Sequence, residues 1–553
     1  MKLGLRHLIA LLNLCNTMLA YLGRLNLSTT IVEMVIDRNS NESISSLQTS
    51  PNHFDHSKSL NSNDNITDQI VKAIENSAKN IPNERHKRKD RAKRYDWNQK
   101  EQGIVLGAFF YGYFSMQVVN GRLAEIFGPR ILCTVGQLVS GVINLSTPFL
   151  ADYFWLLFVS RIVLGAFQAA FYPACYALTA RWIPDNERSL INSMPYIGSN
   201  FGTIIASLMA GFLTSKTFDF GWPSVFYVSG TIILIFACIN YLLIRGYPEE
   251  HWLISDDELN YIKSNLNERS NFEDNFSASK KIDPMKSKNI EVSWAKIFTN
   301  KMVWIGILAH WSMVWPMMVI KLKFPDFMHN VLHVPMEKNG IFTSLMCFSE
   351  SLSLFGGGLL ADYLIKNRII RKQTTRKLFQ FFGQTLAGSI LVLVIWTDSK
   401  PNQFIAIMMA AMFLNGLQSG GLVPLPSDLS NEFSATIFSI FNMVAMTNGF
   451  VCPLVIGYIL DLDPNNLRNQ WHLIIFITMA IQILGGVVFG LFVKAEKQTF
   501  AKLITKPNKN DQNFYSNNNQ SYRSENNNNN NNNIAYIENL NRIENRINHR
   551  DLN

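Results

Sequence analysis

The stretch Gly121–Arg130, with the sequence GRLAEIFGPR, lies between two long apolar runs. A related stretch, Gly358–Tyr363 with the sequence GLLADY, follows another apolar run in the second half of the chain. In both stretches an acid stands four residues after a glycine. Glycine lets two helices approach closely, and a carboxylate can pair with cationic or helix-end groups. The repeat predicts two related halves with a shared conformational motif, formed by Gly121, Glu125, Gly128, Arg130, Gly358 and Asp362.

Long apolar runs make up most of the remaining sequence. A helix needs roughly 20 mainly apolar residues to span a bilayer. Six runs of this length come before a polar linker and six come after it, at approximately residues 7–35, 102–122, 131–151, 154–182, 190–214, 223–245, 302–325, 339–361, 377–397, 403–425, 434–460 and 471–494. We therefore expect an all-α membrane protein with twelve transmembrane helices in two six-helix halves.

The composition supports this expectation and excludes several classes of protein. Charged residues are 16% of the 553 residues, against about 25% in soluble domains. The chain has a net charge of +9, and its basic residues cluster between the apolar runs. This placement indicates that they orient the chain in the membrane, and no nucleic-acid partner is expected. All six cysteines lie in apolar runs, so neither disulfides nor a metal site are expected. The sequence has no catalytic or phosphate-binding motif, which predicts a protein that is not an enzyme and needs no cofactor.

The short loops predict the orientation of the chain. Basic residues concentrate in alternate loops, which places both termini in the cytoplasm by the positive-inside rule. The expected divisions are an N-terminal half at 1–245 with a long exoplasmic loop at about 37–99, a cytoplasmic linker at 246–298, a C-terminal half at 299–494, and a disordered Asn-rich cytoplasmic tail at 495–553. The long loop contains two candidate glycosylation sites, Asn41 and Asn65. Within the linker, a short amphipathic helix is expected to be capped by Ser255 or Asp256.

Arg24 is a charged residue inside the first apolar run. A charge at the centre of a bilayer costs at least ~2.5–3.5 kcal/mol, so it is expected to face protein or a water-filled cavity. The steps of three and four that separate Asn13, Thr17, Tyr21, Arg24 and Ser28 place them on one face of a helix. This face predicts the lining of an anion path. The alternative is an arginine that only holds helices together.

Several motifs give the chain a specific family resemblance. Two six-helix halves in parallel repeat are the layout of major facilitator carriers. In detail, the sequence resembles solute carrier family 17, which includes sialin-like anion carriers and sodium–phosphate transporters. The similar stretches are Arg24–Ser28 (RLNLS), Phe109–Tyr113 (FFYGY), Gly121–Gly128, Tyr172–Cys175 (YPAC), Arg181–Pro184 (RWIP), Glu187–Ser189 (ERS), Gly221–Tyr227 (GWPSVFY) and Lys338–Gly340 (KNG). The resemblance implies transport of organic or inorganic anions, driven by protons, sodium or membrane potential.

The resemblance also implies roles for two arginines. Arg24 matches the family's first-helix arginine that faces the anion, and Arg161 matches a second conserved arginine. Arg161 shares a helical face with Gly165, Gln168 and Tyr172. A guanidinium fork binds two oxygens of a carboxylate or phosphate at once, although Arg161 could instead bridge to a carboxylate in the bundle. The complete set of expected substrate-binding residues is Arg24, Arg161, Tyr111, Tyr172, Gln168 and Asn442.

Departures from the family pattern concern titratable groups. Gln168 stands where proton-coupled members typically have glutamate. Leu106 and Met313 stand where vesicular glutamate transporters have histidine and arginine, which argues against a vesicular glutamate transporter. Asp428 is retained in Pro426–Asn431 (PSDLSN), whereas the histidine of the corresponding family stretch is lost.

Two residues in the second half are candidates for handling a coupling proton. Glu350 lies near the middle of the eighth apolar run, and His310 lies in the middle of the seventh. A buried carboxyl group can exchange a proton during transport, and the charge of histidine changes near neutral pH. The alternatives are an ion pair between Glu350 and an arginine, and simple packing of His310.

These observations predict a secondary active transporter that moves a small anion by alternating access, coupled to protons. The alternatives are a sodium-coupled cotransporter of phosphate or another anion, and a non-transporting receptor with a carrier fold. The expected coupling ion is H⁺ or Na⁺, and the other expected partner is the lipid bilayer. The protein is expected to be a monomer in the plasma membrane or in a lysosomal or vesicular membrane.

Overall fold

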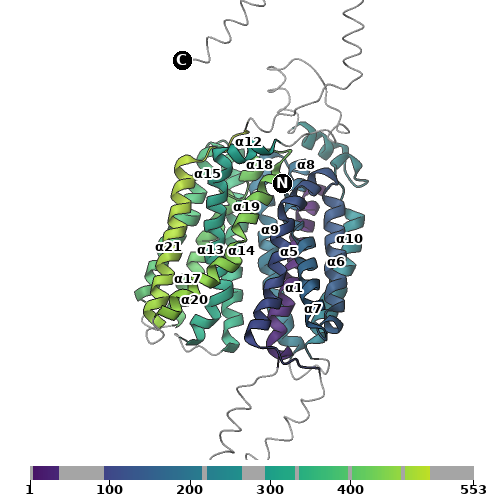
Figure 1. Cartoon of the computed structure of the whole chain (residues 1–553). Coiled ribbons are helices and arrows are strands. Elements are labelled where there is room, and N and C mark those ends of the chain that lie inside the picture. Colours follow the sequence, from purple (N-terminus) through teal and green to yellow (C-terminus); the bar gives the residue numbers. More distant parts are fainter. Residues whose placement is uncertain are drawn as a thin grey trace, which may run out of the picture. The chain divides into compact units, whose positions relative to one another are not determined.

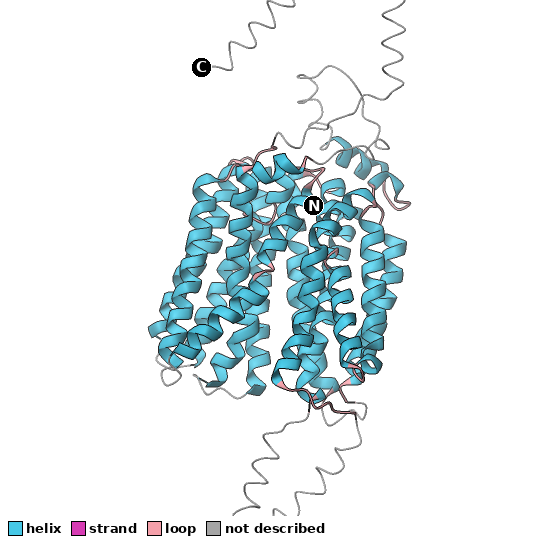
Figure 2. Ribbon diagram, viewed as in Figure 1, coloured by secondary structure: helices cyan, strands magenta, loops and turns pink. Residues whose placement is uncertain are grey.

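The computed structural model describes residues 4–35, 92–214, 221–264, 293–330, 336–396, 401–462 and 467–498. The helices below all belong to one compact unit, Met1–Ser279 with Trp294–Ala501. The predicted glycosylation sites Asn41 and Asn65, most of the predicted tail and the middle of the linker lie outside the described residues. In the described part every regular element is helical, and the one β-type contact is an isolated bridge between Val35 and Tyr95 (Figure 2).

The N-terminal half contains the first six predicted spans. Its helices are α1 (Leu5–Met34), α5 (Gln99–Ile126), α6 (Pro129–Leu150), α7 (Phe154–Gln168), α8 (Phe171–Trp182), α9 (Arg188–Leu213) and α10 (Pro223–Leu243), with a short η2 (Asp185–Glu187) before α9. The predicted fourth span is divided between α7 and α8. The interruption is at Ala169 and Ala170, and Pro173, in the first turn of α8, lacks the N–H that would bond to the carbonyl of Ala169.

The C-terminal half contains the other six spans, and several are interrupted. It comprises α12 (Trp294–Thr299), α13 (Lys301–Asn330), α14 (Met336–Lys366), then α15 (Lys372–Gln380), η5 (Phe381–Leu386), α16 (Ala387–Ile390) and η6 (Leu391–Trp396), followed by α17 (Pro401–Gly416), η7 (Leu417–Gly420), α18 (Leu425–Leu429), α19 (Ser434–Ala445), α20 (Asn448–Leu462) and α21 (Leu467–Phe492). The η5 segment has π-helical geometry. The interruption between η7 and α18 contains Gly421 and Pro424, two residues that break helices.

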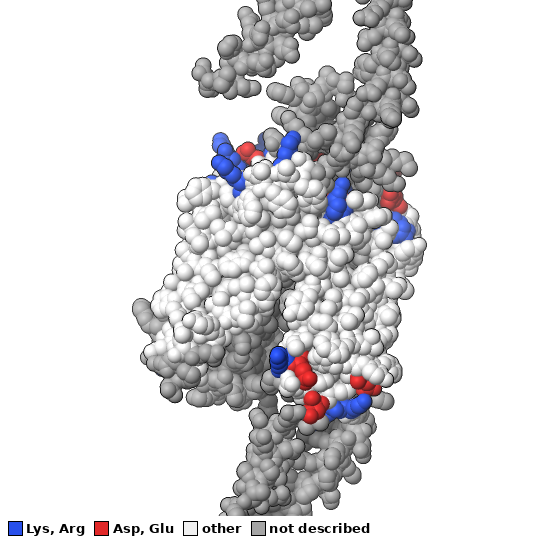
Figure 3. All heavy atoms as spheres, in the orientation of Figure 1, with Lys and Arg blue, Asp and Glu red and all other residues white. Residues whose placement is uncertain are grey.

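The helices are suited to a membrane. Eleven helical segments of the described chain are long and apolar enough to cross one. The remaining predicted span, α5, has 28 residues and lies within the same bundle (Figure 1). Figure 3 shows a nearly uncharged middle band between two ends that carry the charged residues. The expected fold class is therefore confirmed, and the predicted spans differ from the observed helices mainly at the interruptions.

Close contacts between helices position the central residues. A Cβ atom at Gly112 of α5 would clash with the backbone carbonyl of Ile162, and one at Gly165 of α7 would clash with that of Phe109. Lipid tails are as apolar as helix surfaces, so close packing contributes more to helix association here than hydrophobic burial does. The Gly112–Gly165 crossing therefore holds α7 against α5, and Arg161 lies on α7 one turn before Gly165.

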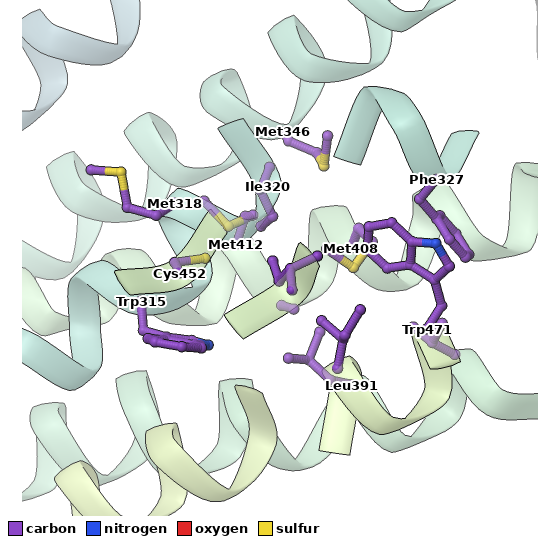
Figure 4. Packing of buried hydrophobic residues seen from close by; sticks show 14 of the residues in the cluster. Trp315, Met318, Ile320, Phe327, Met346, Leu391, Met408, Met412, Cys452 and Trp471 are labelled. Atoms are coloured by element: carbon purple, nitrogen blue, oxygen red, sulfur yellow. The ribbon is translucent and has the colours of Figure 1, made fainter. Parts of the chain in front are cut away.

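The two halves lie side by side in Figure 1, and they meet along two pairs of elements. Helix α9 of the first half packs against α14 of the second, and α5 and α8 pack against α19. Within the C-terminal half, a large apolar cluster includes Trp315, Met408, Met412 and Trp471 (Figure 4).

The short segment 92–98 lies against the end of the N-terminal half. The Tyr95 N–H donates to the carbonyl of Met34 at 2.7 Å, and the Tyr95 hydroxyl donates to Asp152 at 2.9 Å. Lys93 forms an ion pair of 2.7 Å with the same carboxylate, and the indole of Trp222 donates to the Lys93 carbonyl. The Lys93 ammonium and the Tyr95 hydroxyl together hold the pKa of Asp152 below its ordinary value. Burial and the Asp152 carboxylate raise the pKa of Tyr95.

The predicted linker helix spans at least residues 256–264, and its contacts lie in the N-terminal half. The Ser255 hydroxyl accepts a bond from the Glu258 N–H, so Ser255 is the cap rather than Asp256. The Glu258 carboxylate accepts the N–H groups of Leu5 and Arg6 at 2.8 and 3.1 Å. Because these are free donors at the first turn of α1, the start of the linker is joined to the start of the chain.

Candidate functional site

Arg24 of α1 is half-buried in a cage of aromatic rings. Its guanidinium carbon lies 4.3 Å from the ring centre of Phe109, 4.9 Å from Phe110, 5.1 Å from Tyr21 and 5.7 Å from Tyr113. A cation over an aromatic face is stabilised by about 0.5–2 kcal/mol, which offsets part of the cost of its burial. Among the described residues Arg24 makes no ion pair, so aromatic rings rather than a carboxylate accommodate its charge.

Arg161 of α7 lies next to Arg24 and has unused hydrogen-bond donors. Only 2% of the residue is exposed, and its Nη2 donates to the backbone carbonyl of Arg24 at 2.8 Å. Its Nε and Nη1 atoms have no partner within the described chain. A buried donor without a partner costs about 1–3 kcal/mol, and more when the group is charged. The carboxylate bridge considered as an alternative is not found among the described residues, and two N–H directions remain available for an oxyanion.

Asn442 of α19 connects the two halves near these arginines. Its Nδ2 donates to the hydroxyl of Tyr113 on α5 at 3.0 Å, and it is within hydrogen-bonding reach of His310 on α13. His310 is 3% exposed, and its ring is 5.7 Å from that of Phe438. Asn442 and His310 therefore lie close to each other and to the ring of Tyr113 that faces Arg24.

Tyr172 also lies at the contact between the halves, whereas Tyr111 does not. The ring of Tyr172 is 5.3 Å from Tyr196 and 5.7 Å from Phe438, which belongs to the other half. Tyr111 is 62% exposed on the outside of α5. Two residues are about 200° of rotation on a helix, so Tyr113 occupies the inward position expected for Tyr111. The sequence FFYGY identified the segment but could not distinguish its two tyrosines.

Gln168 is buried against a neighbouring helix. Only 3% of it is exposed, and its Nε2 donates to the Ser140 hydroxyl of α6 at 3.3 Å. The structure thus places Gln168 in contact with α6 rather than in the aromatic cage around Arg24.

Glu350 of α14 is a second polar connection between the halves. It is 5% exposed and accepts bonds from Asn200 of α9 at 2.9 Å and from Asn415 of α17 at 3.1 Å. Asn415 continues into a chain of buried amides, because its Oδ1 accepts from Gln418, whose own Oε1 accepts from Gln380. The sequence singled out Glu350 but not its amide partners, since Asn200 and Asn415 lie 150 and 65 residues away.

The two acids of the repeated motif lie at the starts of helices in the opposite half. Glu125 accepts the N–H of Thr436 in the first turn of α19 at 2.8 Å, and the side chain of Arg122 at 2.8 Å. Asp362 accepts the N–H groups of Ser189 and Leu190 in the first turn of α9, at 3.0 and 2.9 Å. Helix N-termini carry free donors and partial positive charge, so these acids bind helix ends as the repeat predicted.

The glycines and the arginine of the motif have distinct surroundings. A Cβ at Gly121 would clash with Ser439, and one at Gly358 would lie 2.8 Å from the Cα of Leu190. Gly128 has a φ of 85°, a conformation that favours glycine, immediately before α6 begins. Arg130 donates twice to the carbonyl of Tyr241, at 2.9 and 3.2 Å, and so joins α6 to α10.

Buried ion pairs strengthen the same end of the bundle. Arg376 is fully buried and contacts Asp428 at 2.7 Å and the Ser189 hydroxyl at 2.7 Å. Lys372 contacts the other oxygen of Asp428 at 2.6 Å, and Arg188 donates to Asn431 at 2.6 Å. We call Glu125, Asp362, Arg376 and Arg188, with their cross-half partners, the inter-half latch. Figure 3 shows a hollow between the halves toward the opposite, lower end of the view. The latch contacts therefore join the halves at one end of the bundle, and the face seen in Figure 3 is hollowed toward the other end.

Comparisons with known proteins agree with this architecture. A model of the Major Facilitator Superfamily matches residues 14–453. The solved structure of the proton:xylose symporter XylE superimposes with a TM-score of 0.57 at 13% identity, covering 88% of this chain and 96% of that one, which shows a shared fold.

Curated relatives are similar over most of the chain. Human sialin is 27% identical over 497 residues, which are 90% of each protein. The transporter slc-17.2 of Caenorhabditis elegans is 28% identical over 74% of this chain and 80% of its own length, and vesicular glutamate transporter 3 of Danio rerio is 27% identical over 74% and 66%. The resemblance to solute carrier family 17 is thus confirmed, and these relatives are transporters rather than enzymes. The chain belongs to the Major Facilitator Superfamily and is a multi-pass membrane transporter.

Proposed function

We propose that this transporter carries a small organic or inorganic anion, and that Arg24 and Arg161 bind it. The observation that carries the proposal is the buried guanidinium of Arg161, whose Nε and Nη1 have no partner within the described chain. An incoming carboxylate or phosphate would supply two acceptor oxygens to that fork. The printed names of the relatives, sialin and vesicular glutamate transporter 3, are consistent with an anionic solute.

The proposed transport cycle is alternating access between the two halves. The inter-half latch joins them at one end, and rocking of the halves about the central site would break it and close the other end. We place both termini and the linker 246–298 in the cytoplasm, so the latch is on the cytoplasmic side and the hollow faces the exoplasmic side. The loop at 37–99 would then be exoplasmic and open to glycosylation at Asn41 and Asn65.

We propose protons as the coupling ion, with Glu350 or His310 as the group that binds them. Both are buried near contacts between the halves, where a change of charge would alter those contacts. Sodium is the alternative, because Gln168 cannot titrate where proton-coupled relatives typically have an acid. No cofactor is needed for either scheme, and the working unit is a monomer in the plasma membrane or in a lysosomal or vesicular membrane.

Uptake by proteoliposomes tests the function and its coupling together. The purified chain is reconstituted, and uptake of radiolabelled sialic acid, glutamate and phosphate is measured with pH and sodium gradients imposed separately. Uptake of one of these anions that follows the pH gradient is the expected result. Uptake driven only by sodium would replace protons as the coupling ion. Specific binding of an anion without any flux would favour a receptor with a carrier fold.

A further inference from the structure

Three buried amides join Glu350 to the end of the bundle that carries the inter-half latch. Asn415 of α17 donates to Glu350 at 3.1 Å and accepts from Gln418 of η7. Gln418 in turn accepts from Gln380 of α15 at 2.9 Å. All three amides are buried, and we call Asn415, Gln418 and Gln380 the amide chain.

The far end of the amide chain reaches the latch through the backbone. Gln380 Oε1 accepts the N–H of Leu422 at 2.9 Å, in the interruption between η7 and α18. Arg376 lies one turn before Gln380 on α15 and donates to the carbonyl of Gly420 at 3.1 Å. The same guanidinium contacts Ser189 in the first turn of α9, which belongs to the other half.

The amide chain therefore lies between two contacts that the C-terminal half makes with α9. One is Glu350 with Asn200, and the other is Arg376 with Ser189. The backbone between them is irregular, because α15 is followed by the π-helical η5 and α17 by the 3₁₀ turn η7 and its interruption. Such segments depart from the regular helical bonding ladder and often mark functional positions. Side-chain bonds thus supply a connection that no continuous helix supplies here.

The hydrogen bonds of the amide chain have one direction. Each amide donates toward Glu350, and the last acceptor, Gln380 Oε1, is used by the Leu422 N–H. Reversal of Gln380 would set its NH₂ group against the Leu422 N–H, so the backbone fixes the order of the bonds. A chain ordered in this way requires an acceptor at its other end, and Glu350 is that acceptor.

We propose that Gln380 and Gln418 are positioning residues that make the two contacts with α9 break and re-form together. The inference rests on the proposed alternating access, in which both contacts must break. A fully bonded buried network is rigid, so the latch end of the C-terminal half moves with Glu350 as one body. Without the amide chain, η5 and η7 would open locally, and loss of one contact would no longer weaken the other.

A double-mutant cycle tests this coupling in the full chain without its native cysteines and with Ser434→Cys. The Ser434 hydroxyl is buried and contacts the Tyr176 carbonyl of the other half, so separation of the joined end exposes this position to a polar maleimide. Asn200→Leu removes a donor to Glu350, and labelling should accelerate about tenfold, as expected for one hydrogen bond to a charged group. When Gln418→Met is already present, the same replacement should accelerate labelling less than about threefold.

Two further variants make the test specific. Gln482→Met is the matched control, because Gln482 is a buried glutamine of the same half with no bond to the amide chain within the described residues, and Asn200→Leu should keep its whole effect there. Asn415→Leu breaks the amide chain one step nearer Glu350 and should reduce the effect as Gln418→Met does, which decides the question if Gln418→Met does not fold.

Equal acceleration by Asn200→Leu in every background would overturn the proposal, because the halves would then be rigid without the amide chain. No acceleration in any background would also overturn it, since the two contacts would be independent in the unaltered chain. The labelling needs no anion, so failure of this inference is distinguishable from failure of the proposed anion transport.

Discussion

Arg24 and Arg161 satisfy their buried charges in different ways. Arg24 uses the faces of four aromatic rings, and Arg161 uses one backbone carbonyl and leaves two donors free. A purely structural arginine in a bilayer would be expected to have its donors filled by protein groups. This difference is the reason for assigning the pair to the proposed anion site.

Replacement of Arg24 tests this interpretation directly. Arg24→Ala should abolish anion uptake without lowering the amount of protein in the membrane, because the aromatic residues around it still pack. Arg24→Lys should recover only part of the uptake, since an ammonium has no planar fork. Radiolabel uptake and surface abundance are measured together, with Arg371→Ala as a control at an exposed arginine. Normal uptake by Arg24→Ala would remove Arg24 from the substrate site.

The contacts of Glu350 suggest a different replacement. Glu350→Gln keeps the size of the side chain and most of its hydrogen-bonding capacity but cannot lose or gain a proton. If Glu350 binds the coupling proton, the dependence of uptake on external pH should flatten while some uptake remains. The control is Glu249→Gln, because Glu249 is a partly exposed acid whose ion pair with Lys263 lies outside the spans. An unchanged pH profile in Glu350→Gln would exclude this residue from coupling and leave His310 or sodium.

At the scale of elements, the α5–α7 crossing has the sharpest test. Gly112→Ala would place a methyl group against the Ile162 carbonyl, and overpacking of this kind costs about 1–3 kcal/mol. The midpoint of thermal unfolding should fall, and uptake should fall with it because Arg161 would shift relative to Arg24. Gly107→Ala on the same helix has open space around the new methyl group and is the matched control. Equal stability of the two variants would show that the crossing can relax.

Segment 92–98 gives a prediction about pH. Because the pKa of Asp152 is lowered in the folded protein, its contacts contribute fully above the ordinary aspartate pKa of about 4. These contacts are lost only as the pH falls through the lowered pKa that Asp152 has in the folded protein. Hydrogen exchange at the Tyr95 amide, corrected for the intrinsic rate, should stay slow from pH 7 to about 4 and accelerate below it. Asp152→Asn should exchange faster already at neutral pH, and acceleration near pH 6 in the unaltered chain would contradict this account.

The sequence predicted elements better than their interruptions or their rotation. Apolar run length identifies a span whether or not the helix is continuous, so the break at Ala169 and Ala170 and the π-helical turn at Phe381–Leu386 were missed. On α5 nearly every position is apolar or aromatic, so periodicity could not decide between Tyr111 and Tyr113. Partners such as Asn200 and Asn415 depend on how helices distant in the sequence pack, which a single sequence does not specify. The repeated motif was informative because its two acids have the same kind of helix-end partner.

At the scale of the whole molecule, the inter-half latch is the feature that must break during transport. Asp362→Asn would leave one acceptor for two N–H groups of α9 and remove a charge from the helix end. Such contacts are worth about 0.5–2 kcal/mol, so the joined state should become several-fold less populated. In a chain without its native cysteines that carries Ser434→Cys, at a buried hydroxyl that contacts the Tyr176 carbonyl of the other half, labelling by a polar maleimide should accelerate correspondingly. Asp257→Asn, at an exposed acid of the linker helix, is the control.

Glu125→Gln should have a similar effect, because Glu125 binds the start of α19 as Asp362 binds the start of α9. The double variant should exceed either single variant, since the two contacts lie on different helix pairs. Labelling at the Ser434→Cys position that does not change in any of the three variants would show that other contacts, such as Arg376 with Ser189, hold the joined end alone.

The aromatic cage around Arg24 has an electrical consequence. An arginine held by rings rather than by a carboxylate keeps its whole charge when the carrier is empty. A monovalent anion carried without a proton would lower the charge of the loaded carrier by one unit, whereas an anion carried with one proton would leave the loaded and empty forms equal in charge. One elementary charge moved across the full membrane is worth about 2.3 kcal/mol per 100 mV. The ratio of protons to anions would therefore decide how strongly the resting potential acts on the loaded carrier compared with the return of the empty one.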